Sequence, residues 1–276
     1  MLNNVSALSV NFKNTSELAG EMMKNNKLLW KGVLALCLAM VLISCAANLE
    51  KKRQQSKAMR ALGEAYLREG NYTEALKELL KAESLHPNDP LLQNDLGLAY
   101  MAKKSYDNAK EHFKKAIALK PEYASAKNNL GTAYLATEAW DDAISVFKDV
   151  LSDLLYATPH YAYSNLGLAY YNKGDYRQAE AYYLKALDVE PDFVLALRGL
   201  GRTYAAMNKM KAAIETFEKA LQHAADYAEL NMDLADAYQK TMQYEKALYY
   251  YRKVETLAPE TPLAEEAKRK ADELAK

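Results

Sequence analysis

Cysteine is almost absent from this chain of 276 residues, which has only Cys37 and Cys45. A signal peptide described below would remove Cys37, so the mature chain would keep one cysteine and have no disulfide. We therefore expect packing alone to hold the fold. An excess of charge of one sign is also lacking: 36 basic residues balance 36 acidic ones, and without residues 1–44 the counts are 32 and 34. This balance argues against nucleic acid as a partner.

Patterns that carry catalysis or bind metals are missing as well. The four histidines have no cysteine partner at ligand spacing and no Glu-x-x-His pair, so we expect no metal site. No glycine-rich phosphate loop follows a strand pattern, and G-x-S-x-G does not occur. We therefore expect a protein without a cofactor that is not an enzyme.

One short apolar run lies near the N-terminus. Three lysines between residues 24 and 31 precede the mostly apolar residues 32–43. This pattern is typical of a secretory signal peptide, and the run is too short for a comfortable membrane span. It ends in Leu-Ile-Ser-Cys at 42–45, which resembles the lipobox of bacterial lipoproteins. The resemblance implies that Cys45 is acylated and becomes the first residue of the mature chain. The alternative is a signal anchor with an incidental cysteine.

The segments around this run have simple interpretations. Residues 1–21 are polar and aperiodic, and we interpret them as a non-structural extension or a mis-assigned start, with the signal peptide at 22–44. The alternative is an unusually long n-region. Residues 45–55 form a short polar tether. In the lipoprotein family, an aspartate directly after the acylated cysteine commonly retains the protein in the inner membrane of Gram-negative cells. Ala46 at this position therefore implies an outer-membrane lipoprotein that faces the periplasm.

From residue 56 onward the sequence repeats itself. A Leu-Gly or Leu-Ala pair recurs at spacings of 34, 34, 36, 34 and 34 residues, and a tyrosine follows three residues after each Gly or Ala. An alanine follows twelve residues after the Gly or Ala, and a large apolar or aromatic residue comes four further on. The Gly or Ala positions are Gly63, Gly97, Gly131, Gly167, Gly201 and Ala235, and the large residues are Leu79, Phe113, Phe147, Tyr183, Phe217 and Tyr251.

This pattern resembles the tetratricopeptide repeat, which has the same period and signature positions. The resemblance implies an all-α fold, a right-handed superhelix of six helical hairpins with helices A and B. The six units are 56–89, 90–123, 124–159, 160–193, 194–227 and 228–261, and residues 262–276 are expected to form a capping helix. We expect the glycines to let helix A approach helix B, where the Ala75 position is also small. The third unit is two residues longer than the others, which predicts either a harmless loop or a functional change in the superhelix.

In tetratricopeptide proteins, fixed positions of helix A line the concave surface. In the middle repeats these positions are apolar, and toward both ends they become charged. The predicted groove residues are Leu91, Leu98, Met101, Leu135, Tyr161, Leu168, Tyr171 and Leu195. The Lys and Asn clamp of chaperone-binding members is absent. An apolar groove with polar ends predicts a protein partner that supplies an extended or helical segment with several hydrophobic anchors.

A lipobox, a short tether, six repeats and a lengthened link after the third repeat together resemble the PilF/PilW pilotin family of type IV pilus assembly. The resemblance implies an outer-membrane scaffold that assists the localisation and assembly of the secretin subunit without catalysis. The alternative is a periplasmic adaptor lipoprotein for peptidoglycan hydrolases or outer-membrane assembly factors.

Overall fold

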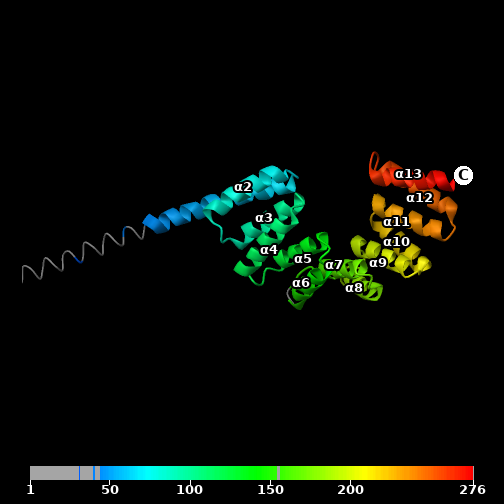
Figure 1. Cartoon of the computed structure of the whole chain (residues 1–276), viewed down its shortest axis with the longest axis horizontal. Helices are drawn as coiled ribbons and strands as arrows, with labels where there is room; N and C mark the ends of the chain where they lie inside the picture. The colour runs from blue at the N-terminus through cyan, green and yellow to red at the C-terminus, as the bar shows by residue number, and fades with distance from the viewer. Residues whose placement is uncertain (1–30, 32–39, 41–43, 154–155, 276) are drawn as a thin grey trace, which may run out of the picture.

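The computed structural model describes residues 31, 40, 44–153 and 156–275. All regular secondary structure in these residues is helical, and the helices pair as hairpins along a curved path (Figure 1). Helix A of the first repeat is the end of a helix that includes residues 44–68. The helices after it are α2 (Tyr72–Leu85), α3 (Pro90–Ala102), α4 (Tyr106–Leu119), α5 (Ala124–Ala136), α6 (Trp140–Ser152), α7 (Pro159–Asn172), α8 (Tyr176–Val189), α9 (Val194–Ala206), α10 (Met210–His223), α11 (Ala228–Lys240), α12 (Tyr244–Leu257) and α13 (Pro262–Leu274).

Each helix packs mainly against the helices directly before and after it in the chain. Helices A of adjacent repeats also contact each other, as α7 does with α9 and α9 with α11. This nearest-neighbour packing is that of a solenoid. The predicted tetratricopeptide superhelix is confirmed. At its C-terminal end, α13 packs on α12 and buries Ala264, Ala267 and Ala271.

The close approach of helices A and B depends on the repeated glycine. A Cβ atom built at Gly131 would lie 2.6 Å from Cε1 of Phe147, and one at Gly167 would lie 2.7 Å from Cδ1 of Tyr183. Such distances are far below ordinary van der Waals contact, so no larger residue fits without movement. The small alanine of helix B is therefore only part of the reason for the glycine. The large side chain one turn later packs directly against it.

The turn between helices A and B places one residue of each repeat in the left-handed region. Gly70 and Gly174 have φ angles of 77° and 80° there. Glycine adopts this conformation without steric cost. The other four repeats have a residue with a side chain at the same position, and its φ angle is 58° or 60°. These residues are Lys104, Glu138, Asn208 and Met242.

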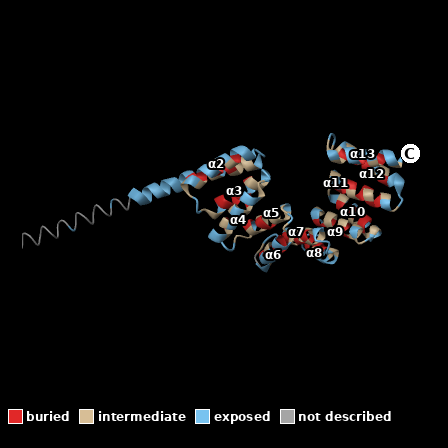
Figure 2. Ribbon diagram, viewed as in Figure 1, coloured by how far each residue is buried: buried red, intermediate tan, exposed pale blue. Residues whose placement is uncertain are grey.

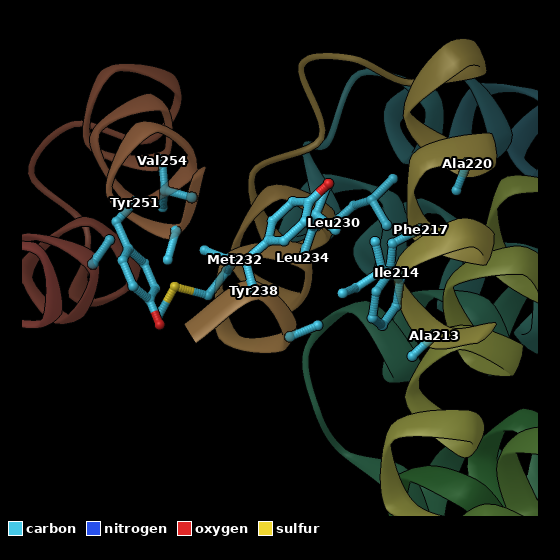
Figure 3. Close-up of a cluster of buried hydrophobic side chains, with 14 of the residues drawn as sticks. Ala213, Ile214, Phe217, Ala220, Leu230, Met232, Leu234, Tyr238, Tyr251 and Val254 are labelled. Carbon is cyan, nitrogen blue, oxygen red and sulfur yellow. The ribbon is translucent and has the colours of Figure 1, made fainter. Parts of the chain in front are cut away.

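The core follows the helices as a continuous layer. Figure 3 shows α11 between α10 and α12, with Tyr238 and Leu234 of α11 beside Phe217 of α10. On the other side of α11, Met232 faces Tyr251 of α12. Buried residues occur on the helices along the whole array, and exposed residues alternate with them (Figure 2). Each helix is thus stabilised by its two neighbours.

The N-terminal segment differs from the array in its exposure. Residues 45–55 are helical and exposed throughout (Figure 2), and burial begins at Ser56, whose hydroxyl donates to the Ala82 carbonyl at 2.9 Å. The extension predicted for 1–21 lies outside the described residues, as does nearly all of the signal peptide predicted for 22–44. None of the helices in the described part of the chain is both long and apolar enough to cross a membrane.

The longer link of the third repeat runs from α6 to α7, and residues 154–155 lie outside the described part. Tyr156 in this link packs against the cluster that contains Phe147 and Leu166. The link therefore packs, through Tyr156, against a buried cluster that is shared by the third and fourth repeats.

Candidate protein-binding groove

The eight predicted groove residues all lie on helices A of repeats two to five. They come from α3, α5, α7 and α9, and none of them is buried. Leu91, Leu98, Tyr161 and Leu195 are between 37% and 51% exposed. The other four are half-buried.

Three of the half-buried residues pack against the core. Met101, Leu135 and Tyr171 each pack against a buried cluster of their own or the neighbouring repeat. Part of their apolar surface is therefore already used to stabilise the fold. The exposed leucines and Tyr161 have more surface left to bury against a partner.

Two hollows lie on this side of the later repeats. The first, between α7 and α9, has a volume of about 160 Å³ and brings Leu168 and Leu195 together; we call it the α7–α9 hollow. The second, between α9 and α11, has a volume of about 180 Å³ and includes Tyr171; we call it the α9–α11 hollow. Arg202 lines both hollows. A bound segment that runs from the fourth repeat toward the sixth would contact the leucines of the α7–α9 hollow first and the charged residues of the α9–α11 hollow next.

An aromatic cluster lies where α7 and α9 begin. The rings of Tyr161 and Phe193 lie 5.0 Å apart in an edge-on arrangement, and His160 lies 4.4 Å from Tyr161 and 5.0 Å from Phe193. Aromatic side chains carry much of the binding energy at protein interfaces. Neither His160 nor Phe193 was predicted, because each occupies a position outside the fixed groove positions of helix A.

Many charges at the two ends of the groove are paired between adjacent repeats. At the N-terminal end, Arg60 bonds Glu64 at 2.5 Å and Asp95 at 3.1 Å. Burial and the neighbouring Glu64 carboxylate raise the pKa of Asp95 to about 7, although the Arg60 guanidinium acts in the opposite direction. Two carboxylates thus share one guanidinium in a partly buried site.

At the C-terminal end the carboxylates also have partners. Arg198 bonds Asp233 at 2.5 Å, and Lys270 bonds Asp236 at 2.7 Å. The Tyr251 hydroxyl donates to Asp236 at 2.6 Å as well. The Arg198–Asp233 pair joins the fifth and sixth repeats, and the Lys270–Asp236 pair joins the sixth repeat to α13, so both stabilise the stacking of the superhelix. The Tyr251–Asp236 bond lies within the sixth repeat and joins its helices A and B.

Outside the groove, the sequence drew attention to the predicted acylation site, Cys45, and to the histidines. Cys45 is exposed and carries a free thiol. His112 is half-buried and lies 2.7 Å from the Gln93 side-chain oxygen, and burial lowers its pKa. Within the described residues, no three His, Cys, Asp or Glu side chains come together in a way that could hold a metal ion.

Solved structures of known proteins share this fold over almost their full length. PilW, described as a widely conserved type IV pilus biogenesis factor, is 23% identical with a TM-score of 0.71, covering 77% of this chain and 98% of PilW. PilF of Pseudomonas aeruginosa is 20% identical with a TM-score of 0.66, covering 80% of this chain and 99% of PilF. At these identities the likeness establishes the fold.

Sequence comparison agrees. A curated relative, the CTR9 homolog of Arabidopsis thaliana, is 33% identical over 106 residues, which are 37% of this chain and 10% of the relative. The chain thus matches only about a tenth of that relative's length. Family models described as tetratricopeptide repeat or TPR repeat match residues 63–104, 94–161, 160–193, 199–227 and 228–261. Since these matches together span well over half of the chain and agree with the six hairpins, the chain belongs to the tetratricopeptide-repeat family.

Proposed function

We propose that this protein is an outer-membrane lipoprotein that acts as a pilotin: it binds the secretin subunit of a type IV pilus system in its groove and assists its localisation and assembly. One observation carries the proposal. The chain presents an apolar groove on a six-repeat superhelix that corresponds to nearly the whole of PilW and PilF, of which the first is described as a type IV pilus biogenesis factor.

The size of the groove suits a moderately tight interaction. Burying one exposed leucine in a complex contributes roughly 1.5–3 kcal/mol. A micromolar dissociation constant corresponds to about 8 kcal/mol. The four exposed groove residues are already about half covered in the free protein, so together they would supply about 3–6 kcal/mol of this, and a charge placed on two of the groove leucines should abolish the complex.

The groove is tested with the double substitution Leu98→Glu and Leu168→Glu. Both residues retain solvent contact in the free protein, so the variant should fold with an unchanged melting temperature. We expect it to lose secretin binding and secretin multimers in the outer membrane. The matched control is Leu80→Glu with Leu184→Glu, two leucines of helices B that are 41% and 42% exposed and line neither hollow. Unchanged binding in the groove variant, or equal loss in the control, would refute this role of the groove.

The lipid anchor is tested separately at Cys45. One acyl chain anchors a protein only marginally, whereas the several chains of a bacterial lipoprotein hold it almost permanently. Intact-mass measurement of the membrane form should give an acylated N-terminal Cys45, and Cys45→Ser should release the protein from the outer membrane. An unacylated N-terminus, or continued membrane association of Cys45→Ser, would contradict the anchor without affecting the groove.

A further inference from the structure

Tyr183 has a hydroxyl at a packing position that is apolar in most of the other repeats. The equivalent residues in four other repeats are Leu or Phe and have no hydroxyl. In the sixth repeat the equivalent Tyr251 bonds Asp236 and Gln239, each at 2.6 Å. Tyr183 is only 3% exposed, and no hydrogen-bond partner for its hydroxyl occurs in the described part of the chain. The hydroxyl oxygen is not among the fully buried side-chain atoms that lack a partner, so it opens onto the solvent of the hollow and can donate to a group that enters from outside the chain.

The position opposite this hydroxyl is Gly199, whose absent side chain makes room for it. The other repeats have Ala61, Asp95, Asn129, Asn165 and Asp233 at this position. A Cβ atom built at Gly199 would lie 2.6 Å from the Tyr183 hydroxyl oxygen. Tyr183 and Gly199 both line the α7–α9 hollow. The extra hydroxyl and the missing side chain thus occur together and leave the phenol at the wall of the hollow.

Arg202 supplies a positive charge beside this phenol. Its guanidinium lies over the ring of Tyr171 at 5.0 Å, and within the described residues it forms no ion pair. Asp233 and Asp236, the two carboxylates that line the α9–α11 hollow with Arg202, are already bonded to Arg198 and Lys270. Burial raises the pKa of the Tyr183 phenol more than Arg202 lowers it, so the hydroxyl stays protonated and can donate.

We propose that Tyr183 and Arg202 bind a carboxylate of the partner segment in the α7–α9 hollow, with an apolar side chain next to that carboxylate lying against Leu168 and Leu195. A carboxylate only accepts hydrogen bonds, and here it would receive them from a phenol and a guanidinium, which are strong donors to an anion. The carboxylate belongs to an acidic side chain or to a chain terminus. The inference rests on the proposed function only in that the groove takes a protein segment.

Small probes test the site without secretin. The purified protein is titrated with N-acetyl-leucine, with its uncharged amide, and with N-acetyl-leucyl-aspartyl amide, while the NMR amide signals of Gly199 and Arg202 are followed. For ligands of this size we expect a dissociation constant on the order of 1 mM. Binding of the first acid identifies a terminal carboxylate as the ligand, and binding of the aspartyl compound identifies a side chain. Equal binding of the uncharged amide, or binding of neither acid, would overturn the proposal.

Matched variants then assign the contacts. Tyr183→Phe restores the residue found in the Phe217 repeat, so it should fold normally and bind the acid about tenfold more weakly, which corresponds to 1.4 kcal/mol. The control Tyr182→Phe removes a hydroxyl from the adjacent residue, which does not line the hollow, and should bind normally. Arg202→Gln should abolish binding, and the exposed Arg177→Gln should not. Normal binding by Tyr183→Phe or Arg202→Gln would contradict the assignment. Since secretin is absent from these titrations, their outcome is independent of the pilotin proposal.

Discussion

Replacing Gly131 by alanine sets two effects of known size against each other. Alanine is about 1 kcal/mol better than glycine in a helix interior. At this site, however, the new methyl group would lie 2.6 Å from Cε1 and Cζ of Phe147 and 3.0 Å from its Cδ1. Overpacking of a close-packed site costs typically 1–3 kcal/mol. We therefore expect Gly131→Ala to lower the free energy of unfolding by about 0–2 kcal/mol.

The contact is tested by making Gly131→Ala also in a protein whose Phe147 ring has been removed. Phe147→Ala alone should cost about 3–5 kcal/mol because it leaves a cavity. In that background the methyl group meets no ring, so Gly131→Ala should now raise the free energy of unfolding by up to about 1 kcal/mol. Urea unfolding of the four proteins, followed by circular dichroism, gives the coupling energy. If Gly131→Ala destabilises both backgrounds equally, the close contact with Phe147 is not the reason for the glycine.

Three further predictions concern single side chains. Glu138→Gly should raise the unfolding free energy by about 0.5 kcal/mol in urea titrations, because a left-handed φ is strained for glutamate, whereas Asn208→Gly should change little, since asparagine tolerates it. Because the pKa of Asp95 is raised, the folded state binds more protons than the unfolded state between the ordinary pKa of 3.8 and about 7. The melting temperature should therefore fall as pH rises through this window, and Asp95→Asn should remove that pH dependence. Tyr251→Phe should lower the unfolding free energy by about 1–2 kcal/mol through its lost hydrogen bonds, whereas Tyr183→Phe should leave it almost unchanged.

The sequence predicted the hairpins because each repeat encodes its own packing several times. The period of the Leu-Gly pairs placed Gly131 and its equivalents on helix A, and the structure has helices at these places. The left-handed turn residues could be recognised only at Gly70 and Gly174. At Lys104 or Met242 the neighbouring helices impose the same backbone conformation on a residue that does not prefer it.

The groove was harder to predict, because helix A positions that face the concave side also touch neighbouring helices. Whether Leu195 stays exposed while Tyr171 leans on the core depends on the exact rotation of each helix. The pair of Tyr183 and Gly199 was missed for another reason. In the sequence, a single residue that differs from the other repeats cannot be told from ordinary variation. Only the structure shows that Tyr183 and Gly199 contact each other.

Photo-crosslinking tests the central claim, the binding of secretin in the groove, most directly. Benzoylphenylalanine is placed in living cells at Leu195, which is 51% exposed in the α7–α9 hollow, or at Leu184, which is 42% exposed on α8 and lines neither hollow. We expect irradiation to join the secretin subunit to the protein from position 195 and not from position 184. Secretin crosslinks from position 184 alone, or none from position 195 in cells that assemble pili, would contradict the account.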